Sequence, residues 1–131
     1  MSDAEHARLL YRPARDNLVV LETLEPLPAI APAILGFHAQ QAVEKALKAW
    51  LSFLGLAYPR IHHLKNLFDL VEDQDPAGVL PFRALQRLTP FAVQFRYDDL
   101  DPADVTDDFR EVIDQVADLL GHVDRLVNSP P

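Results

Sequence analysis

The chain contains no cysteine, which excludes a disulfide framework, a thiolate zinc site and a cysteine nucleophile. Glycine is scarce, with four in 131 residues, and no alternating apolar and polar run is long enough for a strand, so helices are expected. No window approaches the roughly 18 uninterrupted apolar residues that a membrane-spanning helix needs. Residues 1–6 lack the basic and apolar regions of a signal peptide. We therefore expect a soluble, cytoplasmic, all-α protein.

Basic residues are rare in the C-terminal part of the chain. Residues 98–131 hold 10 of the 20 acidic side chains and only two of the 12 basic ones, Arg110 and Arg125. The formal net charge of −8 therefore arises in this segment, and the pI is about 4.9. A protein that binds nucleic acid over a wide surface needs a basic face, because lysine and arginine displace counterions. No extended nucleic-acid surface is expected, so any polyanion must bind at a local pocket or on a partner.

The length of 131 residues predicts one domain over residues 1–131, since domains commonly hold about 100–200 residues. The apolar periodicity predicts an up-and-down bundle of about five helices, with frayed ends at 1–6 and 128–131. We expect a first helix that is capped by Ser2 with Glu5, is interrupted or kinked at Pro13 and ends at Leu24. Further helices are expected near 33–54, 63–72, 82–97 and 107–127, with a loop at 73–81. The 82–97 segment should have a break or kink at Pro90, with Thr89 as a possible cap, and the last helix should have Thr106 as its N-cap.

The segment from Phe37 to Gly55 is the most informative part of the chain, because its helical faces carry three chemistries. Gly55 supplies the φ > 0 stop that ends the helix. One face is apolar, one strip contains only alanine and suits close approach of another helix, and one face is polar. The apolar face is Val43, Leu47, Trp50 and Leu54; the alanine strip is Ala39, Ala42, Ala46 and Ala49; the polar strip is Gln41, Glu44, Lys45 and Lys48, with His38 beside it.

The run Phe-His-Ala-Gln-Gln-Ala-Val-Glu-Lys-Ala-Leu-Lys-Ala at residues 37–49 resembles the central helix of the HEPN family. These are small all-helical domains of prokaryotes and higher eukaryotes that are associated with nucleotide binding. Weaker matches follow the expected order at residues 14–18, 59–64 and 95–97. The resemblance spans roughly residues 7 to 127. It implies a helical bundle, a homodimer, and a nucleotide-binding or partner-binding role for the polar strip.

Two interpretations of the polar strip remain open. Its amide, carboxylate and ammonium groups could hydrogen-bond a base and pair with a phosphate, or they could be a solvated face held by the Glu44 and Lys48 pair at i, i+4. Arg96 and Tyr97 match the family's arginine and tyrosine pair. Arg96 could bind phosphate and Tyr97 could stack on a base, or Arg96 could pair with nearby aspartates while Tyr97 packs in the core. We expect the strip and Arg96 to line one recess.

His38, His62 and His63 are candidate acid-base groups, because histidine changes charge near neutral pH. A histidine at the start of a helix can equally be a cap or a packing contact. By the resemblance, His62 matches the family's histidine at the head of the third helix, whereas His63 stands where an aspartate is more usual. No His-x-x-x-His pair or carboxylate cluster has ligand spacing, so neither a metal nor another cofactor is predicted.

One departure from the family concerns catalysis. Ribonuclease members carry an arginine followed four to six residues later by a histidine, and no arginine of this chain has a histidine at that interval. Arg60 precedes His62 by only two residues, and no histidine follows Arg96 before His122. Efficient metal-independent RNA cleavage is therefore not expected. Arg96 could still meet His62 or His38 in space.

Three functions follow from this pattern. The first is a nucleotide-binding or partner-binding subunit, without efficient catalysis, of a two-component, toxin–antitoxin-like system, since similar proteins are often encoded beside a minimal nucleotidyltransferase. The second is a ribonuclease toxin that uses Arg96 with His62 or His38. The third is an interaction module whose acidic C-terminal helix docks a basic protein, although a solvated face explains those acidic residues equally well.

Overall fold

The structure is a computed structural model that describes residues 2–92 and 108–129. These residues form an all-α bundle without a strand. In this part of the chain, no helix is both long enough and apolar enough to cross a membrane. The elements are α1 (Asp3–Leu24), α2 (Pro32–Phe53), α3 (Leu64–Gln74), the one-turn α4 (Pro76–Val79), the 3₁₀ helix η1 (Leu80–Ala92) and α5 (Phe109–Val127).

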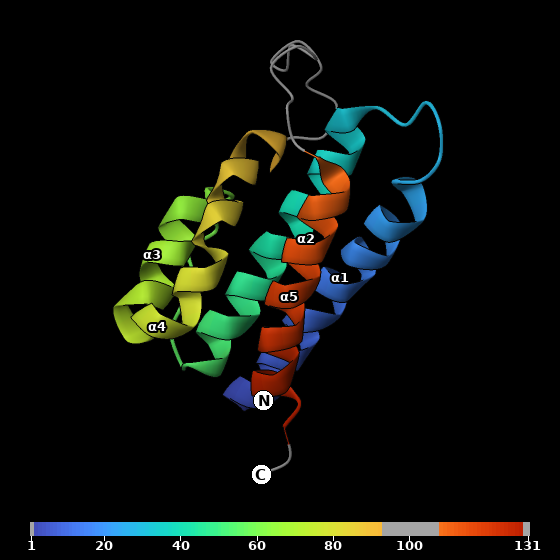
Figure 1. Cartoon of the computed structure of the whole chain (residues 1–131). Coiled ribbons are helices and arrows are strands. Elements are labelled where there is room, and N and C mark those ends of the chain that lie inside the picture. The colour runs from blue at the N-terminus through green and yellow to red at the C-terminus, as the bar shows by residue number, and fades with distance from the viewer. Residues whose placement is uncertain (1, 93–107, 130–131) are drawn as a thin grey trace.

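Helix α2 lies at the centre of the bundle and contacts α1, α3, η1 and α5 (Figure 1). Helices α1 and α5 lie along one side of it, and α3, α4 and η1 lie along the other. Helix α1 runs opposite to α2 and α5. The up-and-down bundle expected from the sequence is therefore confirmed, and α2 is the element that brings the two halves together.

The first helix continues through Pro13, so the predicted interruption is absent, while a kink there stays a prediction. Ser2 caps it, because the Ser2 hydroxyl accepts from the Glu5 amide at 3.1 Å, and residues 3–6 are helical rather than frayed. An internal proline costs a helix about 3 kcal/mol. Buried Ala14 and Leu18 follow Pro13 and pack in the core, and packing of an amphipathic face outweighs such a local cost.

Helix α2 begins and ends as the sequence indicates. Pro32 occupies its first turn, where the missing donor costs nothing. Gly55 has φ +76°, and the amides of Gly55 and Leu56 donate to the carbonyls of Ser52 and Leu51 at 2.9 Å each, which is a Schellman end. All four residues of the alanine strip are 0% exposed. Leu54 is the exception on the apolar face, because it lies past the helix end and is exposed.

The segment after α3 is helical, so the predicted loop at 73–81 is wrong. Asp75 accepts from the Gly78 amide at 3.0 Å and caps α4, with Pro76 in the first turn; the Asp-Pro-Ala-Gly sequence is thus a helix start rather than a turn. The expected break at Pro90 is also absent, because η1 continues to Ala92. Buried Phe91 holds this stretch on the core.

Helix α5 has the predicted apolar stripe, with a different cap. Asp108 is the N-cap and accepts from the Arg110 amide at 3.0 Å. The predicted helix start at residue 107 is therefore wrong, because Asp108 precedes the first turn instead of lying in it. Thr106, the predicted N-cap, lies outside the described residues. The acidic side chains on the outer face are exposed, which confirms the solvated face. Docking of a basic partner there stays a prediction. These exposed residues are Glu111, Asp114, Asp118 and Asp124.

Candidate functional site

The polar strip of α2 is organised around one buried carboxylate. Glu44 is only 4% exposed, and its Oε1 accepts from Gln40 Nε2 at 3.0 Å while its Oε2 accepts from Lys48 Nζ at 3.1 Å. The imidazole of His62 adds a third contact, with Nδ1 at 2.8 Å from Glu44 Oε1. Gln41 Nε2 donates to Gln40 Oε1 at 2.7 Å. These five residues are called the Glu44 cluster below.

His62 is the member of the Glu44 cluster that faces solvent. Its side chain is 66% exposed, against 5% for the Glu44 side chain. An ionised carboxylate can only accept hydrogen bonds, so Nδ1 carries the proton in this contact and Nε2 is the nitrogen left for another partner. The main chain is fixed as well, because the His62 carbonyl accepts from Gln40 Nε2 at 3.2 Å. The arrangement therefore holds an exposed imidazole in one orientation.

The hydrogen bonds of the cluster keep Glu44 ionised. Burial raises the pKa of Glu44, but hydrogen bonds from Gln40 and His62, with the charge of Lys48, outweigh burial and hold the pKa below its ordinary value. A buried charge is tolerated only when it is paired and hydrogen-bonded, and this carboxylate meets both conditions. Glu44 is thus a fixed negative charge directly behind the exposed ring of His62.

Contacts from three elements position the loop that carries His62. Tyr58 lies in this loop, its hydroxyl is 3.0 Å from His6 Nε2 on α1, and the two rings stack. Lys48 Nζ lies 5.9 Å from the centre of the Tyr58 ring, within cation–π range. After the loop, the Leu64 amide donates to the Thr89 hydroxyl of η1 at 3.2 Å. Thr89, expected as a cap near Pro90, instead supports the start of α3.

His38 belongs to a separate contact on the same helix. Its Nδ1 lies 3.0 Å from Asn17 Oδ1 on α1, and Asn17 Nδ2 donates to the Pro13 carbonyl at 2.8 Å. Burial lowers the pKa of His38, and the nearby charge of Lys45 lowers it further. His38 is therefore a neutral, half-buried link between α1 and α2. Among the described residues, no hydrogen bond or ion pair joins His38 to the Glu44 cluster.

The structure thus divides the predicted site residues into two groups. Gln41, Glu44, Lys48 and His62 come together, whereas His38 contacts Asn17 of α1 and Lys45 lies near His38. The predicted pair of Glu44 with Lys48 is confirmed, but Glu44 is buried rather than solvated. Arg96 and Tyr97 lie outside the described residues, so the single recess with Arg96 stays a prediction. His63 precedes α3 without a side-chain cap bond.

The sequence analysis missed Gln40, which is 0% exposed and bonds both Glu44 and the His62 carbonyl. A signal was present, because Gln40, Glu44 and Lys48 are spaced at i, i+4 and i+8 and therefore share one face. Tyr58 and His6 were also missed. Their contact joins positions 52 apart in sequence, and no local pattern indicates it.

A comparison with protein families decides the identity of this fold. A model described as the HEPN domain matches residues 7–126, nearly the whole chain. The chain belongs to the HEPN family. Comparison with curated proteins and with solved structures gave no match.

Family membership confirms the resemblance to the HEPN family that the sequence shows. Every cluster residue, from Gln40 to His62, lies inside the matched range. In residues 2–92 and 108–129, no group of three or more histidine and acidic side chains could hold a metal ion. The chemistry that these residues support directly is hydrogen bonding and proton transfer through His62.

Proposed function

We propose that this HEPN protein is a nucleotide-binding subunit in which His62 contacts a phosphate of the nucleotide. The observation that carries the proposal is the 2.8 Å contact between His62 Nδ1 and the buried Glu44 carboxylate. A histidine oriented by a carboxylate presents its other nitrogen in a fixed direction. Fixed direction lowers the entropy that a ligand contact costs, so such a ring is well suited to binding.

Within this proposal, the contacts of the Glu44 cluster favour His62 over Lys48 and Gln41 as the group that contacts the nucleotide. Lys48 Nζ is bonded to Glu44 and its side chain is 13% exposed, and Gln41 donates to Gln40. These two groups support the cluster, while His62 is its outward-facing group, whose Nε2 donates to a phosphate oxygen when the ring is doubly protonated. Arg96 and Tyr97 complete the proposed site as phosphate and base contacts, on the strength of the family resemblance.

The proposed partner is a small nucleotidyltransferase, with which the protein forms a two-component, toxin–antitoxin-like system. This part of the proposal rests on the family resemblance. We also propose a homodimer, since the two-fold dimer is the commonest soluble oligomer. Co-purification with the product of a neighbouring reading frame tests the first, and light scattering after size-exclusion chromatography tests the second.

Nucleotide binding is tested by ligand-induced stabilisation. A ligand present at 100 times its Kd adds about 2.7 kcal/mol to the stability of the protein that binds it. Titration with ATP should raise the Tm of the unmodified protein and of His63→Ala, because His63 is exposed and lies outside the cluster. It should raise the Tm of His62→Ala less at each concentration. Equal stabilisation of both variants would refute the role of His62.

A ribonuclease is the second candidate function, and the same contact favours it. A carboxylate that holds Nδ1–H leaves Nε2 free to accept a proton, which is the arrangement of a general base. His62 would take the proton of an RNA 2′-hydroxyl, and Arg96 would stabilise the charge on the phosphate.

RNA cleavage assays and growth assays distinguish the two candidate functions. A ribonuclease should cleave RNA without added metal and arrest growth when overexpressed, and His62→Ala and Arg96→Ala should abolish both effects while His63→Ala retains them. A binding subunit should leave RNA intact in all four proteins. Cleavage that survives His62→Ala would exclude His62 as the base.

A further inference from the structure

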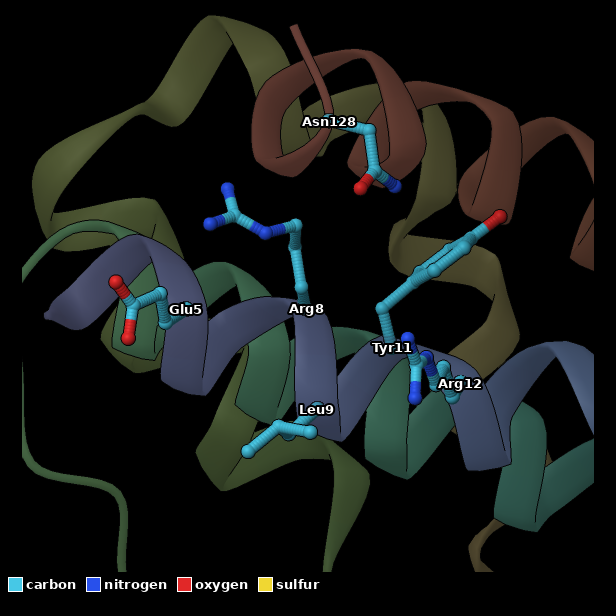
Figure 2. A pocket seen from close by; sticks show the side chains of 6 residues that line it. All are labelled: Glu5, Arg8, Leu9, Tyr11, Arg12 and Asn128. Atoms are coloured by element: carbon cyan, nitrogen blue, oxygen red, sulfur yellow. The ribbon is translucent and has the colours of Figure 1, made fainter. Parts of the chain in front are cut away.

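A hollow lies between α1 and the end of α5. Its volume is about 440 Å³, within the range of roughly 300–1,000 Å³ typical of small-molecule sites. Figure 2 shows its side chains, which come from α1 except for one that follows α5. They are Glu5, Arg8, Leu9, Tyr11, Arg12 and Asn128.

The charge of this hollow is opposite to that of the protein. Two guanidinium groups face one carboxylate among its lining residues, in a chain whose net charge is −8. Arg8 and Arg12 are four residues apart, so they stand one helical turn apart on the same face of α1. A guanidinium binds phosphate oxygens through paired N–H donors, and two on one face can share one anion.

The two arginines have different amounts of free donor capacity. Arg8 Nη1 donates to the Val127 carbonyl at the end of α5, at 3.1 Å. That bond fixes the Arg8 guanidinium at the rim of the hollow and leaves its other N–H groups available. Arg12 is exposed and has no side-chain hydrogen bond or ion pair within residues 2–92 and 108–129. The N–H groups of the Arg12 guanidinium are therefore available to a ligand.

An aromatic ring stands beside the arginines. Tyr11 lies between them in sequence, and Figure 2 shows its ring between the Arg12 side chain and Asn128. Burial raises the pKa of Tyr11, and the charge of Asp124 raises it further against the opposing effect of Arg15. The phenol is thus a neutral donor at physiological pH. A flat ring next to paired guanidiniums suits a ligand that joins an anionic group to a planar body.

We infer that this hollow binds a phosphate monoester with a planar body, of mononucleotide size, through Arg8 and Arg12 with Tyr11 against the planar group. The inference does not depend on the proposed role of His62. Glu5 and Asn128 stand at the rim as acceptors for donor groups of the ligand.

Titration of the ¹⁵N-labelled protein with AMP, inorganic phosphate and adenosine tests the inference. AMP should shift the amide signals of residues 8–12 and Asn128, phosphate should shift the same signals at higher concentration, and adenosine should not shift them. Arg12→Gln should weaken AMP binding about tenfold or more, the loss expected for hydrogen bonds to a charged group. Arg15→Gln should leave it unchanged, because Arg15 is exposed on the same helix but does not line the hollow.

The variants separate this site from the Glu44 cluster. AMP shifts at residues 8–12 that persist in His62→Ala and disappear in Arg12→Gln support the inference. Shifts confined to the surroundings of His62 and lost in His62→Ala would overturn it while supporting the proposed function. Equal affinity in Arg12→Gln and Arg15→Gln would also overturn it. Neither substitution removes a side-chain hydrogen bond or ion pair within residues 2–92 and 108–129, so a loss of binding in Arg12→Gln alone is not explained by unfolding.

Discussion

His62 Nδ1 lies 2.8 Å from Glu44 Oε1, although the two residues are 18 positions apart in sequence. This contact joins the central helix to the loop before α3, and it pairs a solvent-exposed imidazole with a buried carboxylate. Gln40 and Lys48 complete the shell of Glu44. A ring held in this way can act on a ligand without first being ordered.

Glu44→Gln should reduce the free energy of unfolding by about 1–3 kcal/mol, the cost of leaving buried polar groups without their partner. The side-chain amide of the variant has one accepting oxygen and one donating NH2 group. It therefore cannot accept all three of the hydrogen bonds that Gln40, His62 and Lys48 make to the Glu44 carboxylate. Urea unfolding measures the change. Glu72→Gln is the control, since Glu72 is 44% exposed with Arg83 at 3.8 Å, and it should change stability by no more than about 0.5 kcal/mol. Equal losses in both variants would contradict the account.

The contribution of Glu44 should disappear in acid. Its pKa in the folded protein lies below the ordinary value of 4.5, so the unfolded chain binds the proton first as pH falls. The stabilisation is therefore complete above about pH 4.5 and is lost as pH falls from there through the folded pKa. Urea unfolding of the unmodified protein and of Glu44→Gln at several pH values should show the stability difference shrinking below pH 4.5. A difference that stays constant would contradict an ionised Glu44.

Protonation of His122 should destabilise the folded protein in mild acid. Its ring packs 4.7 Å from that of Trp50 and 5.5 Å from that of Phe82, and its buried Nε2 has no hydrogen-bond partner in the part of the chain that the structure describes. Burial lowers its pKa below 6.5, the charge of Arg125 lowers it further, and Asp75 opposes both.

The unfolded chain therefore takes up this proton first, so the stabilisation that His122 gives is complete above pH 6.5 and is lost as pH falls from there through the folded pKa. His122→Phe keeps an aromatic ring at this position and removes the titration. Chemical unfolding between pH 7.5 and 5 should show a smaller decline for the variant than for the unmodified protein. Identical declines would place the pH dependence elsewhere.

Two glycine substitutions should change stability in opposite directions. A Cβ on Gly36 of α2 would lie 2.2 Å from Phe91 Cδ1, so Gly36→Ala forces the ring of buried Phe91 to move, at a cost of about 1–3 kcal/mol. A Cβ on Gly121 of α5 would meet nothing closer than Arg125 Nη1 at 3.6 Å. Gly121→Ala should therefore add about 0.5–1 kcal/mol through helix propensity. Thermal unfolding compares the two, and a stabilised Gly36→Ala would contradict the packing of η1 on α2.

Periodicity and end signals predicted the helices well where packing and local preference agree. Pro32, Gly55 and the alanine strip placed α2 almost to the residue. Three of the errors involve proline. Pro13 and Pro90 were expected to interrupt helices, and Pro76 to mark a loop, but each lies in a helical segment. Local rules state the cost of a proline, whereas tertiary packing decides whether that cost ends the helix.

The part of the site that lies on α2 could be predicted from the sequence, whereas the part that depends on the loop before α3 could not. The spacing of Glu44 and Lys48 indicated their pair. Burial of Glu44 could not be predicted, because it depends on the approach of residues 55–63, and no sequence pattern fixes the path of that loop. The pairing of His62 with Glu44, and of Tyr58 with His6, follows from that path.

NMR of the histidine side chains tests the central claim most directly. Long-range ¹H–¹⁵N spectra resolve Nδ1 and Nε2 of each imidazole and report which nitrogen carries the proton. His62 should show a protonated Nδ1, and titration with ATP should shift its Nε2 signal while the His63 signals stay in place. In Glu44→Gln the ATP-dependent shift should weaken. Nucleotide binding that leaves His62 Nε2 unchanged, or that shifts His63 equally, would contradict the account.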